Sequence, residues 1–339
     1  MPHASDAIDR NGALSMKPLD IVQSAQGETM GTFWSVRAVM QAERSLASQV
    51  AGIQAVLDLV DGQMSTYKSS SSLSRFNAAP AGTWHVLPAE CFEVVKHALQ
   101  VARDSDGAYD PTVGPLVNLW GFGPDGARRE PPSRASIEAA RERIGWWRLK
   151  LDASTHSLYQ PGGVYLDLSS VAKGYSVDLV GRFLDAAGID AWLVEVGGEM
   201  KGKGSKPDGS PWRIGIERPG AASGAVQYAD QLSQVVCLTG RAIATSGDYR
   251  RQFVAEGVTY SHHIDPRTGR PVPHTVASVS VLAGEAMQAD PMGTLMTVLG
   301  PEQGMAYAKD RGLAVMFIVH GANGLEEYLS PAFEAALAS

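Results

Sequence analysis

The sequence predicts an α+β fold in which strands outnumber helices. Short apolar or alternating segments of the kind that form strands lie at 32–39, 164–168, 191–196, 212–217, 234–239, 275–282 and 314–319. Several of these segments follow one another as in hairpins. This succession favours a mixed, largely antiparallel sheet with packed helices over a doubly wound parallel sheet.

Five longer segments have the apolar spacing or the end signals of helices. The expected helices span 43–64, 88–104, 133–145, 171–187 and 286–299. Ser133 is a good N-cap for the third helix, and Gly145 and Gly188 end the third and fourth. No internal repeat is visible among them.

Composition indicates a globular protein. The chain has 339 residues, of which 44% are hydrophobic and 19% charged. This is enough apolar material for one large domain, and we expect a single domain over 27–339 that could divide into two subdomains. Residues 1–26 are polar and aperiodic and are expected to form a disordered tail. The net charge of −7 argues against general nucleic-acid binding, which requires a basic surface.

Neither a membrane span nor a secretory signal is visible. No stretch approaches the roughly 18 apolar residues that a span requires, and the beginning of the chain lacks the apolar core of a signal peptide. The sequence as it stands therefore indicates a cytoplasmic protein, or a periplasmic one if a signal has been removed. The two cysteines, Cys91 and Cys237, form no CxxC pattern and predict no zinc framework.

One candidate metal site is the pair Asp290 and Thr294. Their i, i+4 spacing places both side chains on one face of the helix expected from Ala286. Hard divalent cations such as Mg²⁺ prefer oxygen ligands of this kind. On the pattern alone, Asp290 could equally cap a helix whose first residue is Pro291.

A candidate anion site lies at the turn from Asp167 to Tyr175. The expected strand here leads into a helix N-terminus, where free N–H groups and the helix dipole favour negative charge. Lys173 in the first turn could meet a phosphate or a carboxylate, although no Walker A loop is present. An ordinary junction capped by Ser170 remains an alternative reading.

Three further segments mix polar residues with turn formers. The loop from Tyr260 to Pro271 contains His262 and His263, and a histidine near neutral pKa is a natural general base, although a solvated surface turn would look the same. The glycines of the loop 195–204 would let a flat ring or ribose approach the backbone, which is a weak signal. In the segment 106–124, the aromatic residues Trp120 and Phe122 indicate core or lid more than ligand contact.

In this order, the segments resemble the ApbE family of FAD:protein FMN transferases over about residues 27–325. The matching pieces are Glu28-Thr-Met-Gly-Thr, Met64-Ser-Thr-Tyr-Lys with Leu73-Ser-Arg-Phe-Asn, Tyr109-Asp-Pro-Thr-Val-Gly-Pro-Leu-Val-Asn-Leu-Trp-Gly-Phe-Gly-Pro, Asp167-Leu-Ser-Ser-Val-Ala-Lys-Gly-Tyr, the Val-Gly-Gly-Glu loop, the His-Ile-Asp-Pro-Arg-Thr-Gly-Arg-Pro run, and Ala289-Asp290 followed by Thr294. The long Tyr-Asp-Pro run is specific by itself. Seven pieces in order outweigh the alternative readings of each one.

The resemblance implies a T-fold-like core, a smaller subdomain and an FAD cleft between them. It implies Asp290 and Thr294 as Mg²⁺ side-chain ligands, with a backbone oxygen of Ser170 and a further one at Gly293. It assigns His262 as the base that activates the acceptor hydroxyl. The positions that match FAD contacts are Met30, Tyr67, Ala108, Tyr109, Asp110, Asp167, Lys173 and Ile264.

The implied activity is Mg²⁺-dependent transfer of FMN from FAD to a Ser or Thr hydroxyl, with release of AMP. The implied partner is an acceptor flavoprotein subunit that carries a Ser/Thr flavinylation motif. Two other readings stay open, an FAD pyrophosphatase that uses water and a non-catalytic FAD-binding protein. The chain departs from the common family pattern at His263, at Pro291 and in the missing export signal, and Pro291 is expected to bend the start of its helix.

Overall fold

An eight-stranded antiparallel sheet forms the centre of the molecule. The computed structural model describes residues 20–123, 125–128, 130–220, 231–247, 252–255, 257–273 and 275–338. The strands, in spatial order, are β1 (Asp20–Thr29), β2 (Thr32–Gln41), β6 (Trp192–Val196), β7 (Glu199–Lys203), β10 (Arg241–Gly247), β15 (Val276–Ala283), β16 (Ala314–Gly321) and β17 (Gly324–Leu329). Every neighbouring pair is antiparallel. The α+β prediction is therefore confirmed.

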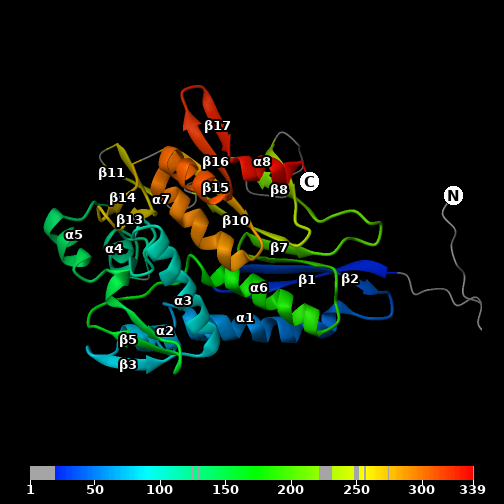
Figure 1. Ribbon diagram of the computed structural model, residues 1–339, viewed down its shortest axis with the longest axis horizontal. Coiled ribbons are helices and arrows are strands. Elements are labelled where there is room, and N and C mark those ends of the chain that lie inside the picture. The colour runs from blue at the N-terminus through cyan, green and yellow to red at the C-terminus, as the bar shows by residue number, and fades with distance from the viewer. Residues whose placement is uncertain are drawn as a thin grey trace, which may run out of the picture.

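Helices cover one face of this sheet (Figure 1). They are α1 (Val50–Met64), α6 (Ala172–Ala186) and α7 (Ala286–Arg311). Alternate residues of β2 and β6, such as Trp34 and Val194, point to this side and pack against α1 and α6. The opposite face, which includes Leu193, is covered by β8 (Arg213–Glu217), β9 (Leu232–Cys237) and α8 (Pro331–Leu337). Period-two alternation thus gives the sheet two separate apolar cores.

A smaller lobe stands beside the helical layer. Its three-stranded sheet contains β3 (Thr83–Val86), β5 (Ser157–Gln160) and β4 (Lys150–Asp152), next to α2 (Ser72–Asn77) and α3 (Ala89–Asp104). Phe92 and Leu99 of α3 belong to the same buried cluster as Leu295 of α7 and Phe317 of β16. The lobe therefore shares its core with the main sheet.

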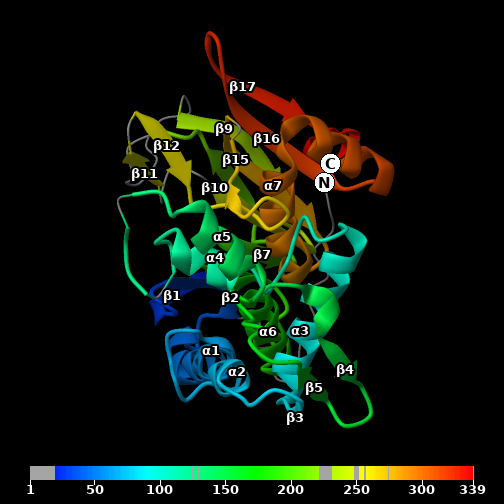
Figure 2. The same cartoon turned by 90° about the vertical axis from the view of Figure 1, so that its left-hand side faces the viewer.

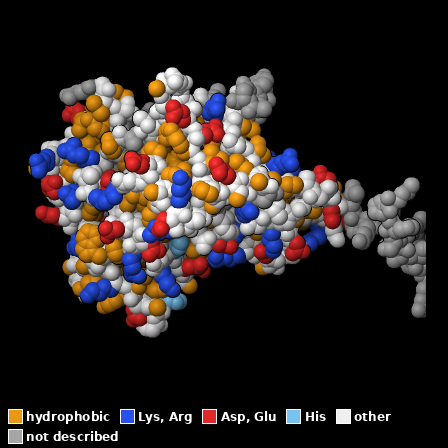
Figure 3. Space-filling view, turned by 45° about the horizontal axis from the view of Figure 1, so that its top comes forward, with side chains coloured by type: hydrophobic (Ala, Val, Ile, Leu, Met, Phe, Trp, Pro, Cys, Tyr) orange, Lys and Arg blue, Asp and Glu red, His pale blue; other side chains and the backbone are white. Residues whose placement is uncertain are grey.

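The last group of elements lies at one end of the sheet (Figure 2). It consists of α4 (Gly114–Leu119), α5 (Arg134–Arg141), β11 (Gln252–Ala255), β12 (Val258–Ser261), β13 (Ile264–Asp265) and β14 (Arg270–Pro271). Two short 3-10 helices, Leu46–Gln49 and Trp146–Arg148, lie outside this group. Leu116, Trp120, Ile137 and Ile264 form its small core. None of the helices formed by the described residues is long and apolar enough to cross a membrane. On the face shown in Figure 3, acidic and basic side chains are interspersed.

Two expectations about strands were wrong. Residues 20–26, expected to belong to a disordered tail, form part of β1, which starts at Asp20 and pairs with β2 over ten positions. Residues 1–19 lie outside the described residues. The segment 164–168 forms no strand. Instead the Asn77 side chain donates to the Leu166 carbonyl and accepts from the Leu166 N–H, both at 2.8 Å. A side chain thus supplies the hydrogen bonds that a neighbouring strand would provide.

The expected helices form, with different ends. The third stops at Arg141, before Gly145, and Ser133 caps it as predicted. The fifth continues from Ala286 to Arg311 as α7. Its backbone stays helical at Pro291 and leaves helical geometry at Gly300, where φ is 74°. Only glycine adopts such an angle at low cost, and the following proline disfavours helical geometry there.

Candidate functional site

The buried carboxylate of Asp290 lies where the first turns of α6 and α7 cross. It is 4% exposed, and its Oδ2 accepts a hydrogen bond from the Gly174 N–H at 2.9 Å. Burial raises the pKa of Asp290, while Lys173 and the Gly174 N–H oppose the rise. A Cβ on Gly174 would lie 2.3 Å from the Ala286 carbonyl oxygen, so the crossing requires glycine at this position.

Glu199 and Lys173 complete the charged part of the site. Their side chains form an ion pair, and Glu199 is 4% exposed. Its Oε2 has no hydrogen-bond partner among the residues that the structure describes. The pKa of Glu199 is raised to about 7, mainly by burial and further by the neighbouring Asp290, while Lys173 opposes the rise. Glu199 is a site residue that the sequence reasoning missed, although it belongs to the weak glycine-rich signal at 195–204.

Tyr109 and Ser170 bring two more predicted segments to the same place. The Tyr109 hydroxyl lies 3.0 Å from the Ser170 Oγ. Tyr109 is buried, and burial raises the pKa of its hydroxyl, with Asp290 and Asp167 adding to the rise. The Asp167 N–H donates to the Pro111 carbonyl at 2.7 Å, so the backbone of one segment holds the other.

The donor set fits a hard divalent cation. Asp290 and Glu199 bring two buried carboxylates against one lysine, and Glu199 offers a buried oxygen without a partner among the described residues. Thr294, half-buried, follows Asp290 by one turn. Gly293 packs so closely on β10 that a Cβ would lie 2.7 Å from Ser246 Oγ. The described residues contain no group of three His, Cys, Asp or Glu able to hold a metal, so a cation here needs hydroxyl, backbone or ligand oxygens as well.

The two residues that flank Tyr109, Ala108 and Asp110, are buried. The Asp110 Oδ1 accepts from the Thr112 N–H at 2.8 Å and from its hydroxyl at 2.7 Å. The Asp167 Oδ1 likewise accepts from the Ser169 N–H at 2.8 Å. These carboxylates therefore fix two turns around Tyr109 and Ser170.

Met30 and Tyr67 belong to other elements, the turn between β1 and β2 and the segment after α1. Met30 has a φ of 47° in the turn between β1 and β2. The next residues of that turn approach the site, because a Cβ on Gly197 would lie 3.0 Å from Thr32 and 3.2 Å from the Lys173 side chain. Tyr67, just after α1, is 68% exposed and free to meet a ligand.

His262 and Ile264 belong to the small core at the end of the sheet. The Trp120 indole donates to the Gly269 carbonyl at 2.9 Å, which joins the two long predicted runs. The half-buried His262 ring lies edge-on to Phe122, with centroids 6.3 Å apart, and 4.0 Å from the His263 ring. Ile264 is buried in this core, so its side chain acts in packing. The His262 ring thus contacts Phe122 and His263 beside this small core.

Fold and site together define an antiparallel α+β protein with buried carboxylates at a helix crossing. The chain belongs to the ApbE family, whose family model matches residues 30–317. The match includes every residue of the candidate site, from Met30 to Thr294.

The relatives cover nearly the whole chain. The FAD:protein FMN transferase of Vibrio cholerae serotype O1 is 40% identical over 325 residues, covering 95% of this chain and 94% of that protein. The protein of the same name from Escherichia coli K12 is 39% identical and covers 93% of this chain and 89% of its own length. The apo crystal structure of Pseudomonas stutzeri flavinyl transferase ApbE is 40% identical, with a TM-score of 0.86, and covers 94% of this chain and 98% of its own.

Proposed function

We propose that the chain is a Mg²⁺-dependent FAD:protein FMN transferase. It would join FMN through a phosphoester to a Ser or Thr hydroxyl of an acceptor flavoprotein, with AMP as the leaving group. The buried Asp290 at the crossing of α6 and α7, within a family whose relatives bear this name, carries the proposal.

Asp290 and Thr294 would hold the cation, helped by backbone oxygens of Ser170 and Gly293. When bound, Mg²⁺ neutralises the diphosphate charge that repels a nucleophile and polarises the bond that breaks. Lys173, in the first turn of α6, would bring a positive charge to the same phosphates. The exposed Tyr67 and the turn at Met30 would contact other parts of FAD.

His262 would accept the proton of the acceptor hydroxyl. The hydroxyl oxygen then forms a bond to the flavin-side phosphorus, and the bond from that phosphorus to the bridging oxygen breaks. AMP leaves with the bridging oxygen. Phosphoryl transfer of this kind depends mainly on position and charge stabilisation, which a rigid helix crossing supplies.

The decisive experiment combines the protein, FAD, MgCl₂ and a candidate acceptor, with mass spectrometry of the acceptor and chromatography of the nucleotides. An FMN mass gain with stoichiometric AMP is expected. Asp290→Ala should abolish labelling at limiting Mg²⁺, and His262→Ala should slow it by roughly 10²–10⁴-fold, as loss of a general base does. Free FMN and AMP without labelling would indicate a pyrophosphatase, and intact FAD a binding protein; either result contradicts the proposal.

A further inference from the structure

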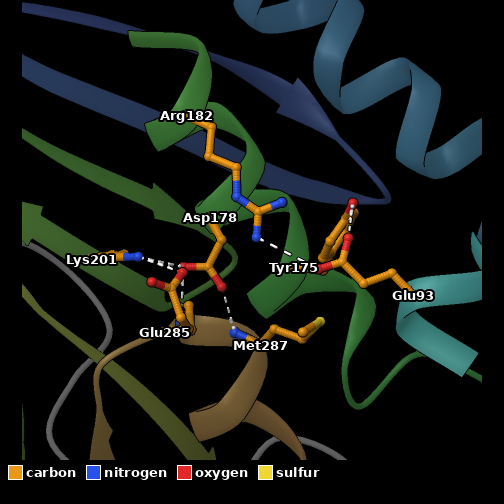
Figure 4. Close-up of polar contacts among 8 residues, drawn as sticks. Glu93, Tyr175, Asp178, Arg182, Lys201, Glu285 and Met287 are labelled. Carbon is orange, nitrogen blue, oxygen red and sulfur yellow. Dashed lines mark hydrogen bonds and ion pairs between the residues drawn. The ribbon is translucent and has the colours of Figure 1, made fainter. Parts of the chain in front are cut away.

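A second carboxylate joins α6 to α7, one helical turn beyond the contact between Gly174 and Asp290. Asp178 of α6 is 1% exposed. Its Oδ1 accepts from the Ala286 N–H at 3.0 Å and its Oδ2 from the Met287 N–H at 2.8 Å (Figure 4). These are the first two residues of α7, whose own N-cap residue Glu285 makes no side-chain cap hydrogen bond among the described residues. Asp178 therefore caps α7 from another helix.

The same carboxylate is tied to the sheet. Lys201 of β7 lies with its Nζ 3.0 Å from Asp178 Oδ1 and 2.6 Å from Glu285 Oε2. Lys201 follows Glu199 on β7 by two residues, so both side chains point to the same side of the strand. One polar cluster, with Asp178 buried and Glu285 partly exposed, thus connects α6, α7 and β7, which carry Lys173, Asp290 and Glu199.

The two carboxylates hold the helices reciprocally. Asp178, four residues after Gly174 on α6, accepts from the start of α7. Asp290, four residues after Ala286 on α7, accepts from the first turn of α6. Each contact joins one helix to the other, and the two contacts lie one turn apart.

We propose that Asp178 is a positioning residue of the metal site. This inference rests on the proposed function. By holding the first residues of α7, Asp178 keeps Asp290 and Thr294 at the distance from Ser170 and Lys173 that a cation and its diphosphate need. Asn at position 178 would retain the size and shape of the side chain. Its NH₂ group, however, would face one of the two N–H donors of α7 and could not accept a hydrogen bond. It would also lack the negative charge that interacts with the helix N-terminus and with Lys201.

The test is a calorimetric titration of the protein alone with MgCl₂, for the wild type and Asp178→Asn. We expect the variant to bind Mg²⁺ about tenfold more weakly, as with loss of groups that orient metal ligands. FMN labelling should need correspondingly more Mg²⁺ yet recover at saturating Mg²⁺. A merely structural defect would instead lower labelling at every Mg²⁺ concentration.

The matched control is Asp185→Asn. Asp185 also lies on α6 and binds a lysine of β7, Lys203, at 2.9 Å, and the Trp192 indole at 2.8 Å. It has no part in the contact between α6 and α7, so its Mg²⁺ affinity should stay at the wild-type value. Circular dichroism checks that each variant is folded. If Asp178→Asn is unfolded, Lys201→Gln serves instead, because it removes the ion pair that holds the Asp178 carboxylate. It should also weaken Mg²⁺ binding.

The outcomes separate the two proposals. Equal Mg²⁺ affinity in folded wild type and Asp178→Asn would overturn the positioning role and leave the transferase proposal standing. An equal loss in Asp185→Asn would also overturn it, because any weakening of α6 would then suffice. Absence of Mg²⁺ binding in the wild type, both alone and with FAD present, would remove the metal from the proposed function and the positioning role with it.

Discussion

At the scale of single residues, the candidate site is marked by buried polar groups. Glu199 keeps one oxygen without a hydrogen-bond partner among the described residues, which costs free energy in the isolated protein. A cation beside Asp290 would offset that cost. The charge of Lys173 compensates one of the two carboxylates, and a bound divalent ion would compensate the other.

A different buried group, His97 of α3, makes stability depend on pH. Burial lowers the pKa of His97, and a hydrogen bond with the backbone of Met287 only partly offsets this. The unfolded chain, with an ordinary histidine pKa, therefore binds the proton more tightly than the folded protein. Stability from this group is present above the unfolded pKa and is lost as the pH falls through the lowered folded pKa.

We predict that His97→Gln reduces this acid sensitivity. The free energy of unfolding in urea should fall less between pH 7.5 and pH 5.5 in the variant than in the wild type, because glutamine takes up no proton. The comparison uses the difference between the two proteins, which cancels the titration of other groups. Parallel pH profiles would show that His97 protonates as easily in the folded state as in the unfolded state.

At the scale of elements, glycine sets the distance between α6 and α7. We predict that Gly174→Ala lowers the free energy of unfolding by about 1–3 kcal/mol, as overpacking does, because its Cβ would lie 2.3 Å from the Ala286 carbonyl oxygen and 2.9 Å from Asp290 Cβ. Displacement of Asp290 should also weaken Mg²⁺ binding. Urea unfolding and the MgCl₂ titration measure the two effects.

Gly62→Ala is the control for helix propensity. Gly62 is exposed in α1, and a Cβ there would meet nothing within 4 Å. Alanine should stabilise that helix by about 0.5–1 kcal/mol. If Gly174→Ala stabilised the protein to the same extent, the close helix crossing would not limit the site.

At the scale of the whole molecule, stability depends on the side chains that the sheet buries against its covering elements. Phe317 of β16 is fully buried and touches α7, since a Cβ on Gly304 would lie 2.6 Å from its ring. We predict that Phe317→Ala costs about 3–5 kcal/mol of stability, as for other core phenylalanines. Phe33 of β2 is 71% exposed, so Phe33→Ala should stay within about 0.5 kcal/mol of the wild type. Similar melting temperatures for the two variants would contradict the assignment of the core.

The periodic elements could be predicted from the sequence because their signal is local. Phe92 and Leu99, placed on one face of a helix by their spacing, are both buried in α3. The cap Ser133 likewise forms where the sequence puts it. The strand expected at 164–168 fails because an apolar run shows that a segment is buried and does not show which group accepts its hydrogen bonds; here that group is Asn77.

In the candidate site, too, local features could be predicted from the sequence and contacts between distant segments could not. The sequence alone gives the spacing of Asp290 and Thr294, the position of Lys173 in the first turn of α6, and the order of the family motifs. Tertiary structure decided that Tyr109 meets Ser170, that Glu199 turns inward beside Lys173, and that Asp178 caps a helix 108 residues away. The physical reason is range: helix periodicity and caps depend on neighbours within a few residues, whereas burial, pairing and charge compensation depend on which distant segments the packed sheet brings together.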